Sequence, residues 1–230
     1  MKKTVILFVI FSLLVNFAYA QEDISRIISH YNKQIEDYTP QNGNVSDAVF
    51  ADLIGYEWAH KSIYALFAEN IVSGRASGVF DPGDNVKIKE FVKLVVLTCG
   101  LYDENALADF QNVGKDDWSY HYIASAQSAG VLDFFAADTD FEAYITREQM
   151  AVMCAKALGF LDIELNGEAI GGFADDEEID YQNKRYIYAL RNLQLVSGMG
   201  DGSFMPKSNL RRCDSAVIIY RLHEFIKNSI

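Results

Sequence analysis

The sequence is poor in the residues that build metal centres, redox sites and disulfide scaffolds. Its 230 residues include three cysteines, four histidines and three prolines, and they contain no CxxC, HExxH or GxSxG motif. The histidines show no metal-ligand spacing. The alternating acids Asp138, Asp140 and Glu142 resemble the start of an EF-hand, but Ala143 and Gln149 replace the glycine and the final glutamate that calcium requires. We therefore expect no metal, no cofactor and no catalytic residue.

The cysteines Cys99, Cys154 and Cys213 are an odd number, so at least one thiol is unpaired in a monomer. We expect three thiols in apolar surroundings. A single bridge is the alternative, and the sequence does not choose its pair.

Positive charge is also scarce. The chain has 20 Lys and Arg against 32 Asp and Glu, a formal net charge of -12. This balance argues against nucleic acid as a partner, because a nucleic-acid binder needs a basic face, and it argues against adhesion to anionic lipid. It leaves room for an anionic sugar, since a few well-placed arginines act locally against the overall field.

Long hydrophobic runs are missing after the first twenty residues. Lys2 and Lys3 precede an apolar run over residues 5–15, and residues 18–20 read Ala-Tyr-Ala, a small-x-small cleavage site. The run is too short to cross a bilayer of roughly 30 Å. We interpret residues 1–20 as a signal peptide, with a membrane anchor as the alternative. We therefore expect a secreted chain that is not inserted in a membrane after the signal peptide is removed.

The remaining sequence contains three similar copies of one pattern, in the same order each time. Each copy has a Phe-x-Asp-like segment, a tryptophan or its substitute, an apolar segment that ends in a turn, and a start signal for a second helix. The Phe-x-Asp-like segments are Phe50-Ala51-Asp52-Leu53, Phe110-Gln111-Asn112-Val113 and Phe173-Ala174-Asp175-Asp176. The apolar segments are residues 70–74, 130–134 and 194–198, and the second helices start near residues 86–90, 145–149 and 210–214.

Each copy predicts a helix, a turn-rich loop and a second helix, because apolar residues recur at helical spacing on both sides of a Gly-containing turn. In the second copy, Thr146 and Gln149 form a capping-box pattern. Two short helices bury little alone, so we predict an all-α fold in which three repeats pack as a pseudo-threefold trimer within one chain. The predicted segments are an N-terminal helix and linker (21–46) and repeats 1 (47–108), 2 (109–168) and 3 (169–230).

These motifs resemble those of the S-layer homology (SLH) domain family. Copy three carries Leu195-Val196-Ser197-Gly198 followed by Gly200-Asp201-Gly202-Ser203-Phe204-Met205-Pro206, copy two carries Ile145-Thr146-Arg147, and copy one carries Trp58-Ala59 and Phe80-Asp81-Pro82. The resemblance covers roughly residues 47–230. It implies a non-covalent anchor that binds secondary cell-wall polysaccharide of bacteria in grooves between neighbouring repeats, through an anionic, pyruvylated sugar.

The resemblance also implies the groove residues. An arginine suits the carboxylate of such a sugar, a tryptophan face covers a sugar ring, and glycine allows close backbone approach. In this chain Ile88 replaces the arginine of copy one, Asn112 and Phe134 replace Asp and Gly of copy two, and Gln182 replaces Trp of copy three, so we expect at most two working grooves. The ligand-binding candidates are Arg147, Arg212, Trp58, Trp118, Asp52, Asp175, Gly74 and Gly198.

Three functions remain open from the sequence. The first is an exported, non-catalytic cell-surface module that binds wall polysaccharide. The second is a degenerate triplet that binds another cell-surface protein or serves only as a structural module, with no saccharide binding. The third, a wall-acting hydrolase, is the weakest, because a repeat fold without a unique insertion leaves little room for an active site.

Overall fold

The computed structural model describes residues 50–168 and 171–229. The predicted signal peptide and the predicted N-terminal helix lie outside these residues. Within them the chain is all-α, as expected, and has no β-strand. The elements are η2 (Glu57–Ala59), α2 (His60–Ala68), α3 (Ile88–Thr98), α4 (Tyr120–Ser128), α5 (Arg147–Phe160), η3 (Asp176–Glu178), α6 (Tyr181–Asn192) and α7 (Arg212–Ser229). No helix of the described segments is long and apolar enough to cross a membrane.

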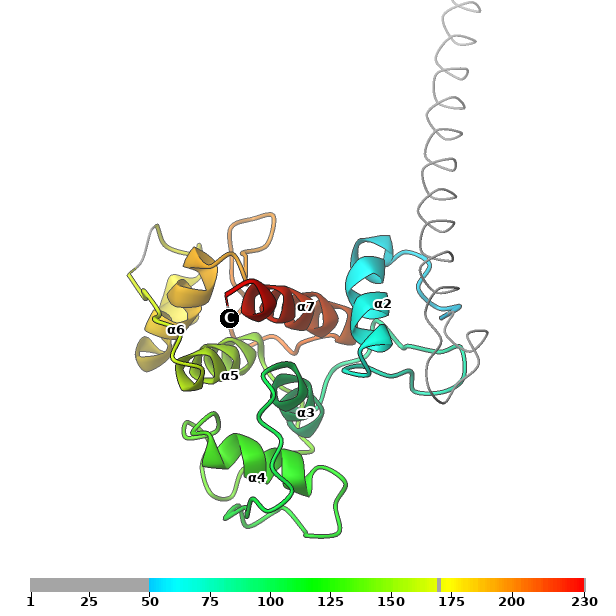
Figure 1. Cartoon of the computed structure of the whole chain (residues 1–230). Coiled ribbons are helices and arrows are strands. Elements are labelled where there is room, and N and C mark those ends of the chain that lie inside the picture. Colours follow the sequence, from blue (N-terminus) through cyan, green and yellow to red (C-terminus); the bar gives the residue numbers. More distant parts are fainter. Residues whose placement is uncertain (1–49, 169–170, 230) are drawn as a thin grey trace, which may run out of the picture. The chain divides into compact units, whose positions relative to one another are not determined.

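Helix pairing crosses the boundaries of the predicted repeats. Helix α4 packs on α3, α6 packs on α5, and α2 packs on α7. Figure 1 shows α3, α5 and α7 near the centre of the helical region, with the other three helices outside them. Each pair therefore joins the second helix of one repeat to the first helix of the following or the first repeat. A single repeat of two short helices therefore depends on the neighbouring repeats for its core.

The hydrophobic core is continuous across these pairs. Helix α3 buries Phe91, Val92, Val95 and Val96, at the spacing that one helix face requires. Each central helix contributes side chains to the core, and α5 is buried on so much of its surface that only a narrow strip faces solvent. One cluster of buried side chains includes residues from all three predicted repeats.

Three backbone hydrogen bonds close a ring around the starts of the central helices. The N–H of Val86 donates to the carbonyl oxygen of Leu210 (2.9 Å), that of Leu210 donates to Ile145 (3.0 Å), and that of Ile145 donates to Val86 (2.9 Å). These are equivalent positions of the three repeats. The ring favours the pseudo-threefold arrangement, which stays an interpretation of the fold.

The first N–H groups of the central helices are satisfied by turns of other repeats. At α5, Arg147 N–H donates to Ser208 (3.0 Å) and Glu148 N–H donates to Pro206 (3.0 Å). Equivalent bonds tie the starts of α3 and α7 to the turns at residues 141–143 and 82–84. The predicted capping box of α5 is confirmed, because the Gln149 N–H donates to Thr146 Oγ1. Helices without a capping hydroxyl therefore still have partners for these donors.

All three cysteines are buried thiols without a disulfide. Burial raises the pKa of Cys99 to about 12 and that of Cys213 to about 11, because desolvation disfavours the thiolate. Burial also raises the pKa of Cys154 well above its ordinary value. The thiols therefore belong to the core and are poorly reactive.

Candidate functional site

Arg212 lies at the start of α7, and its guanidinium reaches the turn of repeat 1. Its Nε donates to the carbonyl oxygen of Phe80 (2.8 Å), and one terminal nitrogen donates to the carbonyl oxygen of Ser73 (3.0 Å). The guanidinium carbon also lies 4.6 Å from the centroid of the Phe80 ring. Burial lowers the pKa of Arg212, and the neighbouring cation Arg75 acts in the same direction. Among the described residues, no carboxylate forms an ion pair with this arginine.

Arg147, at the start of α5, makes the same contacts with the turn of repeat 3. Its Nε donates to the carbonyl oxygen of Phe204 (2.8 Å), and a terminal nitrogen donates to that of Ser197 (3.3 Å). The side chain is more enclosed than that of Arg212, with Arg147 only 8% exposed. Burial lowers the pKa of this guanidinium too. Both arginines therefore bind backbone carbonyls of another repeat and keep further N–H groups for a ligand.

Asp52 and Asp175 hold the two turns that these arginines contact. The Asp52 carboxylate accepts hydrogen bonds from the N–H groups of Phe80 (2.9 Å) and Asp81 (2.6 Å). The Asp175 carboxylate accepts from Phe204 and Met205, both at 2.7 Å. Each turn contains a non-glycine residue in the left-handed region, with a φ of 57° at Asp81 and 58° at Met205. The geometry favours turn support for both acids over the direct ligand contact that the resemblance implied.

Gly74 and Gly198 are required by close packing inside the protein. A Cβ on Gly74 would lie 2.7 Å from the carbonyl oxygen of Val79 and 2.8 Å from the Phe50 ring. A Cβ on Gly198 would lie 3.0 Å from the carbonyl oxygen of Ser203. These glycines let the apolar segment approach the turn, which places the carbonyl groups that the arginines contact.

The two tryptophans lie on the surface and are not core anchors. Trp58 is 53% exposed and Trp118 is 52% exposed. Trp118 has the ammonium groups of Lys89 and Lys93 at 5.3 and 5.9 Å from its ring centroid. Trp58 belongs to η2, which packs against α7. Half-exposed tryptophans remain available to cover a sugar ring.

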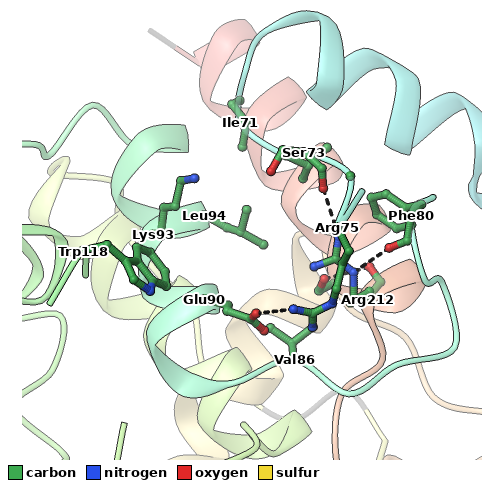
Figure 2. A pocket seen from close by; sticks show the side chains of 13 residues that line it. Ile71, Ser73, Arg75, Phe80, Val86, Glu90, Lys93, Leu94, Trp118 and Arg212 are labelled. Carbon is green, nitrogen blue, oxygen red and sulfur yellow. Dashed lines mark hydrogen bonds and ion pairs between the residues drawn. The ribbon is translucent and has the colours of Figure 1, made fainter. Parts of the chain in front are cut away.

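A groove brings Arg212, Trp118 and Gly74 together; we call it the Arg212 groove. Figure 2 shows Trp118 and Lys93 on one side, Arg212 on the other, and Leu94 between them. Its volume is about 290 Å³, at the small end for ligand pockets, so it suits a short segment of a polymer. The lining residues are Ile71, Val72, Ser73, Gly74, Arg75, Phe80, Val86, Glu90, Lys93, Leu94, Trp118, Arg212 and Ser215.

The lining of the groove is basic although the whole chain is acidic. Arg75 forms ion pairs with Glu90 (2.9 Å) and Asp84 (3.8 Å). Lys93 lies over the rings of Trp118 and Tyr122, each at 5.9 Å, and no carboxylate pairs with it in the described part of the chain. Arg212 and Lys93 are thus two cations without a paired acid. Sequence reasoning missed Arg75 and Lys93, because neither belongs to a repeated motif.

The region around Arg147 lacks these two additional cations. Residues 70–94 of repeat 1 correspond to residues 194–218 of repeat 3 without an insertion. In this alignment, Arg75 corresponds to Met199 and Lys93 corresponds to Val217. The Arg147 region therefore lacks the equivalents of two of the three basic side chains that line the Arg212 groove.

The third equivalent position has no arginine. Ile88 is 3% exposed and is part of the core. Its N–H donates to Ala143 (2.9 Å), as the arginines donate from the equivalent positions. Phe134, which replaces the turn glycine, packs against the core and lies 4.2 Å from the Phe135 ring, centroid to centroid. The backbone framework of this position is kept, but the anion-binding side chain is absent.

Comparisons with known proteins agree with the motifs. Residues 49–87 and 172–212 match the S-layer homology domain. The matches lie in predicted repeats 1 and 3, while repeat 2, which has lost the turn glycine and proline, lies between them.

Several curated proteins are similar to most of this chain. An amylopullulanase of Thermoanaerobacterium thermosulfurigenes is 29% identical over 77% of the chain and 10% of its own length. An endoglucanase of Bacillus sp. (strain KSM-635) is 31% identical over 75% of the chain and 18% of its own length. The S-layer protein EA1 of Bacillus anthracis is 29% identical over 74% of the chain and 19% of its own length. The chain thus spans about a tenth to a fifth of the length of these relatives.

Proposed function

We propose that this chain, whose residues 49–87 and 172–212 match the S-layer homology domain, is a cell-wall-associated module of the bacterial surface. In this proposal it binds an acidic wall polysaccharide in the Arg212 groove. The partner is secondary cell-wall polysaccharide, and the group recognised is the carboxylate of a pyruvylated sugar. Binding anchors the chain to the wall non-covalently. The chain itself takes no part in cleaving the polymer.

The observation that carries this proposal is the charge of the groove. Arg212 is held by two carbonyl oxygens, and Lys93 is held by two aromatic rings, so neither charge is neutralised by an acid. A partly buried cation without a paired anion is costly, and an anionic ligand would recover part of that cost. A guanidinium fork also fits a carboxylate better than an ammonium does.

The other groove residues suit a sugar. The exposed face of Trp118 offers an apolar surface to a ring, and the small residues Ser73 and Ser215 line the same space. Glu90 is the one carboxylate among the lining residues, and Arg75 holds it. This arrangement lacks the pair of available acids that glycoside hydrolysis uses. The groove therefore supports binding without catalysis.

We expect binding to depend on the charge of the polysaccharide. Titration of the purified wall polymer into the protein should give an affinity that falls as salt is added, because the recognised charges are partly exposed. The same polymer with its carboxylates reduced to alcohols should bind at least about tenfold more weakly, a loss of about 1.4 kcal/mol.

Two results would contradict the proposal. Equal affinity for the native and the reduced polymer would mean that the groove does not recognise the carboxylate. Absence of binding to either polymer, with the helical circular dichroism spectrum intact, would favour the alternative of a degenerate module that binds a protein or has only a structural role.

A further inference from the structure

We propose that Lys89 is a positioning residue that holds Trp118 in the Arg212 groove. Lys89 follows Ile88, so it lies where the chain has lost its third arginine. The ion pairs of Lys89, next to the position of the missing arginine, would then support the neighbouring Arg212 groove. The effect on saccharide affinity rests on the proposed function, whereas the placement of the Trp118 ring can be measured without a ligand.

Lys89 is an unusual lysine because it is only 8% exposed. Its Nζ donates to Asp117 Oδ2 (3.1 Å) and contacts the carboxylate of Glu142. The same Nζ lies 5.3 Å from the centroid of the Trp118 ring. The Lys89 side chain is therefore fixed by two acids from repeat 2 and supports the ring of Trp118, the residue after Asp117. A desolvated cation in this position attracts an aromatic face more strongly than an exposed one does.

Asp117 fixes the backbone on both sides of the tryptophan. Its Oδ1 accepts hydrogen bonds from the N–H of Ser119 (2.8 Å) and from the Ser119 hydroxyl (2.7 Å), while its Oδ2 accepts from Lys89. The pKa of Asp117 is lowered, first by the bonds from Ser119 and then by Lys89. Trp118 thus lies between two residues that are bonded to each other, with the lysine beneath its ring.

The equivalent positions of the other repeats show that this arrangement is specific. Lys89, Glu148 and Cys213 each donate their N–H to a turn carbonyl of another repeat, so they correspond to one another. Glu148 is buried and carries a negative charge where Lys89 carries a positive one. It binds Lys207 (2.6 Å) and the side chain of Asn183 (2.9 Å). Gln182 takes the tryptophan position next to this network. Cys213 carries no charge.

A fixed aromatic ring has a clear use in the groove. A half-exposed tryptophan that samples several rotamers must lose that freedom when a sugar binds, and the loss reduces affinity. Lys89 removes part of this freedom in the free protein. Lys93 approaches the same ring from the groove side at 5.9 Å, so it is placed to contact a ligand, whereas Lys89 is enclosed beneath the surface.

The test is the Lys89→Met variant, which keeps the length of the side chain and removes its charge. The placement of the ring is measured in a Trp58→Phe background, where Trp118 is the remaining tryptophan of the two in the chain. We expect Trp118 fluorescence to become more accessible to acrylamide quenching. In the background with both tryptophans, affinity for the acidic wall polymer should fall about fivefold.

Lys87→Met is the matched control. Lys87 binds the same acid, Glu142, at 2.7 Å, and its replacement by methionine changes the net charge equally. Within the described part of the chain, the lysines over the Trp118 ring are Lys89 and Lys93, not Lys87. Lys87→Met should leave the quenching of Trp118 unchanged. If Lys89→Met does not fold, Asp117→Asn gives the same two readouts, because it weakens the fixed pair and keeps the buried lysine. Lys89→Arg should restore quenching to near the wild-type level.

The outcomes separate the two proposals. Unchanged quenching in folded Lys89→Met or Asp117→Asn protein would overturn the positioning role. If the wild type binds the polymer, a loss of affinity for Lys89→Met no larger than that for Lys87→Met would overturn it as well. Increased quenching in a protein whose wild-type form binds no polysaccharide would support the role of Lys89 and reject the proposed function.

Discussion

The Arg212→Gln variant is expected to bind the acidic wall polysaccharide about 100-fold more weakly than the wild type, a loss of about 2.7 kcal/mol. Glutamine can still donate a hydrogen bond to one of the carbonyl groups of Phe80 and Ser73 that arginine contacts. It cannot supply the charge or the planar fork that a carboxylate requires. Isothermal titration calorimetry of each variant with the purified polymer measures the effect.

Two other arginines provide controls for this prediction. Arg211 is adjacent in sequence but points to Asp214, with an ion pair of 2.8 Å, so Arg211→Gln should change the affinity by less than about twofold. Arg147→Gln should have a smaller effect than Arg212→Gln, because Met199 and Val217 replace the added cations there. An equal loss for Arg211→Gln and Arg212→Gln would mean that only net charge matters, and it would contradict a specific site at Arg212.

Replacing Gly74 with alanine is expected to have the largest effect on stability. The added Cβ would lie 2.7 Å from the carbonyl oxygen of Val79, 2.8 Å from the Phe50 ring and 2.9 Å from the carbonyl oxygen of Ala76. Two of these three atoms belong to the backbone, so they cannot move aside by a change of rotamer. We expect a loss of about 2–3 kcal/mol in the free energy of unfolding. Thermal unfolding followed by circular dichroism should show a Tm lower by roughly 5–10 °C.

Gly114 is the matched control, since a Cβ there has no heavy atom within 4 Å and the backbone is not in the left-handed region. Gly114→Ala should change stability by less than about 0.5 kcal/mol. Gly198→Ala should lie between the two, because its closest contact is 3.0 Å. A Gly74→Ala protein as stable as the Gly114→Ala protein would show that the turn can yield, and that the carbonyl groups contacted by Arg212 are not rigidly placed.

Part of the fold and site follows from the sequence because it rests on local pattern. Helical periodicity gives the helices, and the Thr146 capping box gives one helix start. The repeated landmarks also identify Arg212 and Trp118 as groove candidates, and the structure places both in one groove. These features depend on residues close together in the chain or on an offset shared by the copies.

Other features could not be predicted because they depend on contacts between repeats. Lys93 lies on an ordinary helix face in the sequence, and only the packing of α4 on α3 brings it to Trp118. Asp52 looks like a ligand residue in its motif, yet its carboxylate is used by a turn 28 residues away. The buried lysine Lys89 gives no signal, since its two acids come from another repeat. A sequence read alone does not supply such long-range partners.

Retention on purified cell-wall sacculi is the most direct test of anchoring. The protein without residues 1–20 is mixed with sacculi that carry their secondary polysaccharide and with sacculi from which it has been removed, and the bound fraction is measured after centrifugation. We predict retention on the first preparation, release by salt, and little retention on the second. Equal retention on both, or none on either while the protein stays folded, would contradict the account that the Arg212 groove anchors the chain to this polymer.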